Sequence, residues 1–571
     1  MSLLRKRSLQ SLALLAAAGF GCADEREIAA DLVLRNGRIV TVDEANPEGE
    51  AIAVLGDTIL AVGSDREISA YIGRQTDVID LDGQLAIPGF IESHGHFLGV
   101  GNARMQLDLM QVANWGEIVS MVAAAVSDAP PGALVRGRGW HQEKWDKEPP
   151  GNVEGLPTHN TLSAVSPNNP VILGHASGHA AFANAKAMEM AGITRNTPDP
   201  PGGQIVRDAE GNPIGAFRET AQGLLSRATE NATPPDPRRQ AELAIEELLS
   251  KGITSFHDAG SGFGTIDLFK EMVDDGSMGV RLWVMIRASN NQLAERLPDY
   301  RIIGYGNNRL TVRAIKRTID GALGSHGAWL LEPYTDMPSS SGLNTSPISA
   351  LDETARLAVL HGYQLCVHAI GDRANREVLD VYERTFGANP DKENLRWRIE
   401  HSQHLHPGDI PRFGELGVIA SMEGIHATSD GPWVIPRLGE KRAREGAYMW
   451  KALWESGAVV TNGTDAPVED VDPIASYYAT VSRKLADGSV FNPDQRLSRM
   501  EALRSYTING AYAAFEEDLK GSLTPGKLAD ITVLSKDILT IPEDEIPTAQ
   551  VVYTIVGGKV MFSREGWVGN R

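Results

Sequence analysis

The chain has 571 residues, which exceeds one compact domain, so we expect a large core and at least one further unit. With 42% apolar and 22% charged residues it has the composition of a soluble globular protein, and its formal charge of -20 disfavours nucleic acid, whose phosphates require a basic surface. Its two cysteines, Cys22 and Cys366, cannot form a disulfide framework.

Residues 1–22 differ in character from the rest of the chain and are typical of an export signal. Three basic residues from Arg5 onward precede an apolar run, Leu12 to Phe20, that is too short to span a bilayer. The stretch resembles a bacterial lipoprotein signal, in which lipidation of Cys22 anchors the mature chain to a membrane; cleavage after Ala23 by the ordinary signal peptidase is the alternative. We expect an exported bacterial protein, either periplasmic or a membrane-anchored lipoprotein.

Both ends of the chain have the apolar alternation of β-strands. Short runs with turn signals such as Asn36-Gly37 fill residues 30–82, and similar runs recur at 521–534 and 551–562. Two strand-rich ends flanking one long middle predict a small composite β-sandwich from both termini, over residues 30–85 and 510–571.

The middle of the chain alternates helical and strand patterns. A helix predicted at 237–250 begins with Pro237 and leads into a strand at 253–258. The alternation recurs with helices at 351–361, 373–386 and 448–456, followed by strands at 364–368, 395–401 and 458–465. Such units form a parallel sheet, and their number predicts the α/β class with a (β/α)8 TIM barrel over residues 86–509. Cys366, in mid-strand, is expected to be a core residue.

The segment at about 98–235 is far longer than an ordinary connection between a strand and the next helix. A segment of that length needs structure of its own. Because it follows the first barrel strand, whose carboxyl end lies at the barrel mouth, we predict an inserted lid domain over that mouth.

The first predicted barrel strand, within Leu85–His96, ends in two histidines. Because strand side chains alternate, His94 and His96 lie on the same face, as a barrel would present two nitrogen ligands to a metal. Taken alone, a His-x-His pair also occurs by chance on protein surfaces.

Four more residues with metal-ligating or basic side chains are predicted in the later barrel strands or at their carboxyl ends: Lys316, His368, His401 and Asp465. Histidine and aspartate are ligands that Zn²⁺ accepts, and other divalent metals share them. A buried lysine can add CO₂ to its amine and bridge two metals; the alternative for Lys316 is an ion pair with Asp320.

Several ordered motifs resemble those of a known family. They are Pro88–His96, Lys316 followed by Asp320-Gly321, His368, Ile399–His401 and Gly463–Pro467. Together they are similar to the amidohydrolase superfamily, and more narrowly to the amidohydrolase 3 branch, which contains N-substituted formamide deformylases and related metal-dependent hydrolases. The resemblance covers nearly the whole chain from Ala30 to the C-terminus.

The resemblance implies a metal site in the barrel mouth with one or two Zn²⁺ or other divalent ions. Its ligands would be His94, His96 and Asp465 for the more buried ion, His368 and His401 for the second, and a carboxylated Lys316 between the two.

The same resemblance implies hydrolysis of a C–N bond in an amide or N-acyl amine by metal-bound hydroxide. Asp465 would act as general base and then acid beside the ligand His401, and His179 and His426 would contact the substrate or its oxyanion. The alternative for the last two is a packed histidine. The expected partner is a small-molecule amide, and a homodimer is expected only by analogy with other such barrels.

Two other functions are compatible with these residues: an isomerase or deaminase on the same metal barrel, and a non-catalytic surface binding protein. Assay of released products distinguishes the first. An intact ligand set with Asp465 argues against the second, because a binding protein needs no base beside a metal.

Four positions depart from the family pattern. Ser177 and His141 each stand where the family has Asp, Glu423 where it has Gln, and His326 where it has Arg. They fall in the lid and pocket and not in the metal set, so they bear on the choice of substrate. Glu423 adds a carboxylate that either selects a cationic substrate or forms a salt bridge to an arginine.

Overall fold

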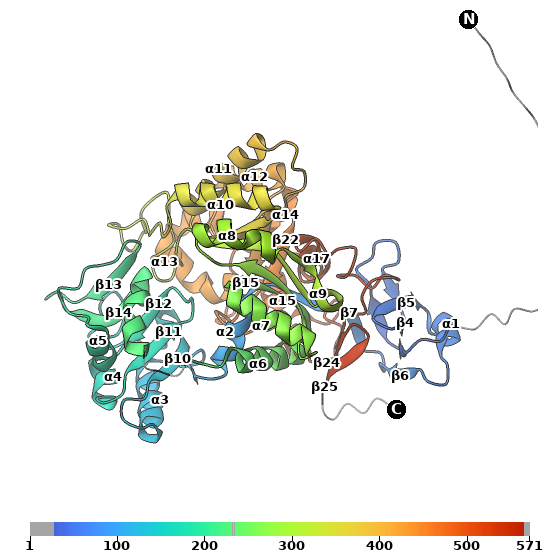
Figure 1. Ribbon diagram of the computed structural model, residues 1–571, viewed down its shortest axis with the longest axis horizontal. Helices are drawn as coiled ribbons and strands as arrows, with labels where there is room; N and C mark the ends of the chain where they lie inside the picture. The colour runs from blue at the N-terminus through green and yellow to red at the C-terminus, as the bar shows by residue number, and fades with distance from the viewer. Residues whose placement is uncertain (1–27, 231, 233, 565–571) are drawn as a thin grey trace, which may run out of the picture.

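The computed structural model describes residues 28–230, 232 and 234–564, so the expected export signal with Cys22 lies outside the described residues. Figure 1 shows three parts in a row: a teal unit of strands and helices at the left, a central barrel, and blue and red strands at the right. Within the described ranges, no helix combines the length and the apolar character needed to cross a membrane.

The central barrel contains eight parallel strands. They are arranged around the barrel in the order in which they occur in the chain. They are β8 (Phe90–Gly95), β15 (Ile253–Ser261), β16 (Arg281–Ile286), β18 (Leu310–Thr318), β19 (Gln364–Ala369), β20 (Arg398–His401), β21 (Ile419–Glu423) and β22 (Val460–Gly463). β22 closes against β8, because the N–H of Asp465 donates to His94 O at 2.9 Å and the N–H of His96 to Ala466 O at 2.7 Å. The predicted (β/α)8 barrel is confirmed.

Helices between the strands form the outer ring (Figure 1). They are α6 (Pro237–Ser250), α7 (Phe263–Asp274), α8 (Asn290–Tyr300), α10 (Ile348–His361), α11 (Asp372–Ala388), α12 (Ile410–Leu416), α14 (Trp450–Glu455) and, after the last strand, α15 (Pro473–Ser482). α6 starts where Asp236 accepts the N–H of Arg238, with Pro237 in the first turn. α10 stops because Gly362 takes a left-handed φ of 70°.

Alternation along the strands separates the barrel interior from the outer core. Ala314 and Cys366 belong to a small cluster inside the barrel, whereas Ile315 packs outward in the main core. Lys316 and His368 lie two residues further along the same inward faces, toward the carboxyl ends of their strands. Cys366 is fully buried, as predicted.

Strands from the two chain ends form two sheets with a shared apolar layer (Figure 1, right). The sheet β5-β4-β1-β6 uses N-terminal residues alone, whereas the sheet β25-β24-β23-β7-β2-β3 combines both ends. Their bounds are β1 (Leu32–Arg35), β2 (Arg38–Val40), β3 (Glu48–Gly49), β4 (Ala51–Leu55), β5 (Thr58–Gly63), β6 (Asp77–Asp80), β7 (Leu85–Pro88), β23 (Ile531–Leu534), β24 (Val551–Val556) and β25 (Lys559–Ser563). This is the predicted composite sandwich.

The teal unit at the left of Figure 1 is a six-stranded sheet with helices, and we call it the lid. It contains β9 (Leu107–Asp108), β10 (Val135–Trp140), β11 (Val171–His175), β12 (Ala180–Ala183), β13 (Gly203–Arg207), β14 (Pro213–Glu219), α3 (Trp115–Asp128), α4 (Asn160–Val165) and α5 (Ala185–Ala191). The chain leaves the barrel through α2 (Phe97–Ala103) and returns through α6. These two helices touch so closely that a Cβ on Gly101 would lie 1.7 Å from Gln240 O.

A buried ion pair joins the barrel to the sandwich. Arg281, at the start of β16, donates from Nε and Nη2 to the carboxylate of Asp530 at 2.7 and 2.9 Å, and both side chains are almost fully buried. Because removal of one partner leaves an uncompensated buried charge, we expect Asp530→Asn to lower the free energy of unfolding by about 3 kcal/mol. Urea unfolding followed by circular dichroism measures the loss.

The matched control is Glu353→Gln, whose exposed carboxylate pairs with Arg356 on α10 at 2.8 Å. That variant should lose less than about 1 kcal/mol. Equal losses in the two variants would contradict the role given to the buried pair.

Candidate functional site

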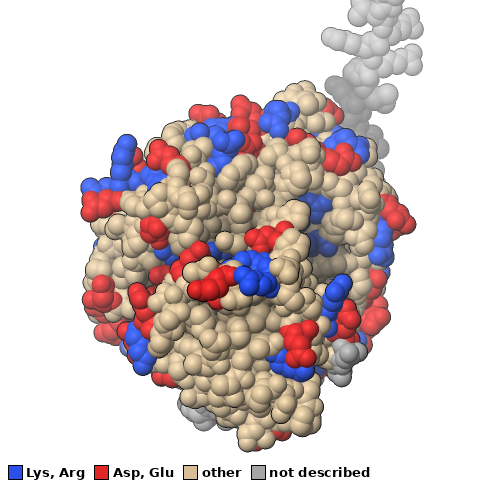
Figure 2. All heavy atoms as spheres, turned by 90° about the vertical axis from the view of Figure 1, so that its left-hand side faces the viewer, with Lys and Arg blue, Asp and Glu red and all other residues tan. Residues whose placement is uncertain are grey.

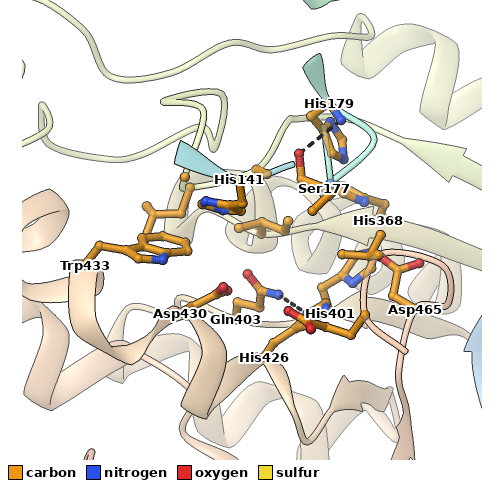
Figure 3. Close-up of a pocket in the computed structure, with 17 residues that line it drawn as sticks. His141, Ser177, His179, His368, His401, Gln403, His426, Asp430, Trp433 and Asp465 are labelled. Atoms are coloured by element: carbon orange, nitrogen blue, oxygen red, sulfur yellow. Dashed lines mark hydrogen bonds between the residues drawn. The ribbon is translucent and has the colours of Figure 1, made fainter. Parts of the chain in front are cut away.

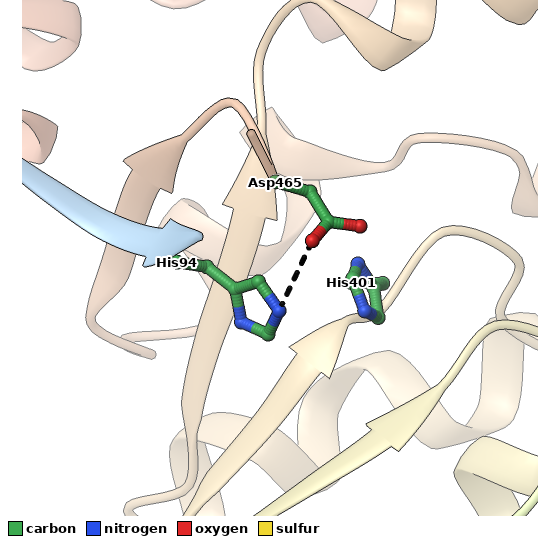
Figure 4. A group of neighbouring side chains, drawn as sticks. All are labelled: His94, His401 and Asp465. Atoms are coloured by element: carbon green, nitrogen blue, oxygen red, sulfur yellow. Dashed lines mark ion pairs between the residues drawn. The ribbon is translucent and has the colours of Figure 1, made fainter. Parts of the chain in front are cut away.

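The six residues proposed as metal ligands all lie at the carboxyl end of the barrel. His94 lies in β8 and His96 directly after it, Lys316 and His368 lie in β18 and β19, His401 ends β20, and Asp465 follows β22. The ligand atoms of His94, His401 and Asp465 lie within 4.8 Å of one another (Figure 4). The barrel closure therefore brings together residues from opposite ends of the chain.

The other three residues surround this group. His94 Nε2 lies 3.5 Å from Asp465 Oδ1, and His96 Nε2 lies 3.2 Å from the same oxygen. Lys316 Nζ lies 3.1 Å from His94 Nε2. The ring of His368 packs edge-on against that of His401, with their centroids 4.4 Å apart.

Two of these side chains are presented by an unusual backbone. His401 has a φ of 76° and Asp465 a φ of 54°, in the left-handed region that non-glycine residues seldom occupy. Backbone strain of this kind is concentrated at functional sites, where the surrounding structure enforces it. Here it falls on two residues of the same cluster.

Carboxylates hold the far side of two imidazoles. Glu400 contacts His94 Nδ1, and Glu423 Oε2 lies 3.0 Å from His401 Nδ1. Arg398 in turn donates to both oxygens of Glu400 at 2.7 and 2.8 Å. A carboxylate that accepts from Nδ1 fixes the ring and leaves Nε2 as the lone-pair donor, which is the arrangement of metal-bound histidine.

Two of the alternatives considered for this site are wrong. Asp320 accepts the backbone N–H groups of Trp329, Ile370 and Gly371 at 2.8 to 3.0 Å and forms no ion pair with Lys316. Glu423 pairs with histidine rings and with no arginine among the described residues.

Burial sets the protonation of the nitrogen donors. It lowers the pKa of His94 to about 4 and the pKa of His368 and of His401 well below the usual range, so these imidazoles are neutral and can donate lone pairs. Burial also lowers the pKa of Lys316, which favours the neutral amine that CO₂ addition needs. Burial raises the pKa of Asp465, but the neighbouring imidazoles, His96 foremost, outweigh it and keep the carboxylate ionised.

Buried polar atoms at this site that lack a hydrogen-bond partner include His368 Nε2 and Glu423 Oε1. An unpaired buried polar atom is costly, so such a group of nitrogen and oxygen donors points to a missing cation. Neutral imidazoles with a carboxylate are the ligands that Zn²⁺ takes. The residues present therefore fit a divalent metal.

Two cavities meet at the cluster and share Ser177, His179, His368, His401 and Asp465 in their walls. The smaller cavity, of about 40 Å³, extends to His141, Asp430 and Trp433 (Figure 3). The larger cavity, of about 460 Å³, extends past Lys316. Acidic and basic side chains are interspersed over the lid face of the molecule (Figure 2).

The lid supplies His179 to both cavities. This residue directly precedes β12, and its Nδ1 lies 2.8 Å from Glu219 Oε2, which leaves Nε2 free. Its ring lies 5.0 Å from that of His368, between centroids. Burial opposes protonation of His179, but the charge of Glu219 and its hydrogen bond outweigh this and raise the pKa.

His426 begins α13 (His426–Gly446) and lines the smaller cavity. Its Nδ1 accepts from Gln403 Nε2 at 2.9 Å, so the proton of the neutral ring lies on Nε2, which has no partner.

The four residues that depart from the family pattern do not all reach the cavities. Ser177 and His141 line the smaller cavity, where His141 stacks on Trp433 at 5.7 Å between centroids. His326 lines neither cavity; its Nε2 lies 3.2 Å from the carboxylate oxygens of Asp336. Its departure from the pattern is therefore structural.

Sequence reasoning missed several residues of the site. Glu400 stands beside His401 in the motif Ile399–His401. The available signal was its position two residues after Arg398 in the strand, which places both charged side chains on the same face. Glu219, which holds His179, follows no motif; no sequence signal identified it.

Glu423 offers a test of the metal site outside the six proposed ligands. Glu423→Gln keeps the shape but removes the carboxylate behind His401 Nδ1, whose pKa burial raises and a bound cation would lower, so we expect divalent-metal affinity to fall about 10-fold. Titration of the metal-free protein with zinc and a competing chelator measures the change. The control Glu353→Gln should bind as wild type, and an unchanged affinity in Glu423→Gln would remove that residue from the metal site.

Comparison with known proteins supplies the family context. A model described as the amidohydrolase family matches residues 77–562. "Protein LONG AFTER FAR-RED 3" of Arabidopsis thaliana is 34% identical over 94% of this chain and 92% of its own length. N-substituted formamide deformylase of Arthrobacter pascens is 28% identical over 94% of this chain and 99% of its own length. The crystal structure of an uncharacterized metal-dependent hydrolase from Pyrococcus horikoshii is similar with a TM-score of 0.70 and 25% identity, and the match covers 90% of this chain and 99% of that chain.

Proposed function

The chain belongs to the amidohydrolase family, and from that premise we propose that it hydrolyses the C–N bond of a small amide or N-acyl amine with a divalent metal. The observation that carries the proposal is the convergence of His94, His401 and Asp465 where two cavities meet. The deformylase relative, named for action on N-substituted formamides, supports a C–N bond as the target.

The proposed ligands divide into two groups. His94, His96 and Asp465 would hold one Zn²⁺, and His368 and His401 a second, with a carboxylated Lys316 between them. When bound, the metal supplies a water of lowered pKa and polarises the substrate carbonyl.

Asp465 is the proposed proton carrier. Its carboxylate is ionised although it is buried, because imidazoles surround it. An ionised carboxylate at this position can take a proton from the attacking water and return it to the nitrogen of the leaving amine, which must be protonated to depart.

His179 and His426 are the proposed contacts to the substrate oxygen. Each ring is fixed at Nδ1, His179 by Glu219 and His426 by Gln403, and both residues line the smaller cavity. His179, whose pKa Glu219 raises, would donate from Nε2 in its protonated form, and neutral His426 would donate from its Nε2–H. Two donors fixed before the substrate arrives can stabilise the negative charge that develops on the carbonyl oxygen.

Asp465→Asn tests the proton-carrier role. Asn retains one ligand oxygen but cannot hold a proton for transfer, so we expect much of the metal to remain and kcat to fall at least about 100-fold. Release of amine from a panel of N-formyl and N-acetyl amines measures kcat, and elemental analysis measures the metal. The control Asp352→Asn, an exposed carboxylate paired with Arg384, should leave both unchanged.

The same panel separates the competing functions. Near wild-type kinetics in Asp465→Asn would refute its role as base. Ammonia released from aminopurines or related rings, with no amide cleaved, would identify a deaminase, and rearranged products an isomerase. Metal-loaded protein that turns over none of these would be a binding protein.

A further inference from the structure

The larger cavity contains two guanidinium groups that the proposed mechanism does not use. Arg287 directly follows β16, at the carboxyl end of the barrel, and Arg317 follows Lys316 in β18; both line this cavity. Neither forms an ion pair with a carboxylate anywhere in the described part of the chain, whereas the acidic side chains of this wall, Glu219 and Asp465, each face imidazoles.

Arg287 is nearly free of contacts. Its only side-chain hydrogen bond is from Nη2 to Thr318 Oγ1 at 3.4 Å, which is long. Its side chain is exposed and lines the larger cavity. Four or more N–H donors of a planar fork are therefore available to a ligand.

Arg317 contributes charge behind Arg287. It donates to Ala288 O at 2.6 Å, to Thr354 Oγ1 at 2.8 Å and to Asn290 Oδ1, all of them uncharged acceptors. A guanidinium stays a cation at neutral pH. Arg317 thus adds to the positive potential of this wall, and neither arginine is paired with a carboxylate among the described residues.

The acidic groups of the same wall are already engaged. Glu219 holds His179 Nδ1 at 2.8 Å, and Asp465 faces His94 and His96. Gly260 on β15 accommodates the stem of Arg287: a Cβ there would lie 3.1 Å from Arg287 Cδ and 3.5 Å from Lys316 Cγ. The backbone therefore places the fork of Arg287 in the same cavity as the metal cluster.

We propose that Arg287, reinforced by Arg317, binds a carboxylate of the substrate, so that the physiological substrate is an anionic amide such as an N-acyl amino acid or the half-amide of a dicarboxylic acid. The substrate class rests on the proposed amide hydrolysis, but the carboxylate site can be tested without it. A guanidinium fork and a carboxylate form a bidentate, charge-assisted pair, which is the strongest contact that this wall offers to a ligand.

The direct test compares two five-carbon acids on metal-loaded protein. Glutarate has a second carboxylate for Arg287, whereas valerate has a methyl group at that end. Titration calorimetry should give glutarate an affinity at least about 10-fold higher than valerate in wild type, and a ratio near one in Arg287→Gln. Arg287→Lys, which keeps the charge and loses the fork, should be intermediate.

The matched control is Arg136→Gln, a half-buried guanidinium without an ion pair that lines a separate cavity near Met105 and Met190. It should keep the wild-type ratio, and thermal melts should show that both Gln variants are folded. Equal binding of the two acids to wild type, or a preference that survives Arg287→Gln, overturns the proposal.

A kinetic arm locates the carboxylate within the substrate. N-acetyl-β-alanine carries it on the amine part and N-propylsuccinamic acid on the acyl part, and N-propylacetamide and N-propylbutanamide are the neutral partners. The better of the two acids should have a higher kcat/KM than its neutral partner. Arg287→Gln should lower the ratio of these two kcat/KM values at least about 10-fold. A glutarate preference without any amide cleavage would leave the carboxylate site standing and refute the proposed hydrolysis.

Discussion

A concentration of buried carboxylates in the barrel mouth constrains the rest of the site. Glu92, Glu400, Glu423 and Asp465 are all at most 7% exposed, and ionised groups cannot remain in such surroundings without compensation. Burial raises the pKa of Glu92 to about 8, so this group is neutral, and Arg398 neutralises Glu400. Burial, with Asp465 and Glu400 nearby, raises the pKa of Glu423 well above its usual range, whereas Asp465 stays ionised among imidazoles that burial keeps neutral. A divalent cation would balance the negative charge of these carboxylates and bind the unpaired donor atoms. It would also lower the pKa of the carboxyl groups around it.

The fold supplies the geometry that this charge requires. Strand alternation turns Lys316 and His368 inward, and left-handed backbone at His401 and Asp465 adds two side chains at the rim. The lid leaves and rejoins the barrel between α2 and α6, and so brings His179 over the cluster. The site is therefore assembled from the barrel, which carries the proposed metal ligands, and from the lid, which lines both cavities with His179.

The larger cavity adds specificity to this assembly. Arg287 and Arg317 lie in the same cavity wall as Lys316, so a substrate with a carboxylate could be held at one end while its amide lies at the proposed metal site. The smaller cavity, lined by Trp433 and Asp430, would take the other part of the proposed substrate.

The predictable and unpredictable parts of this protein differ in the range of the interactions involved. Strand alternation places His94 and His96 on one face, and cap residues such as Asp236 and Gly362 set helix ends, because these signals act within a few residues. Glu400 and His94 are 306 positions apart, so their contact depends on barrel closure. The left-handed φ of His401 had no sequence signal, since histidine does not favour it. The role proposed for Arg287 also had no sequence signal, because the cavity that it lines is formed by residues far apart in the chain.

The central claim is that this cluster binds divalent metal, and metal content per chain tests it most directly. We expect purified wild-type protein, after supplementation with zinc, to carry at least about one ion per chain and His401→Ala to carry less. About two ions in wild type, falling to one or none in Lys316→Ala, would establish a bridged pair. One ion per chain in both proteins would establish a mononuclear site. Wild-type protein that binds no metal, or metal content unaffected by His401→Ala, would contradict the account.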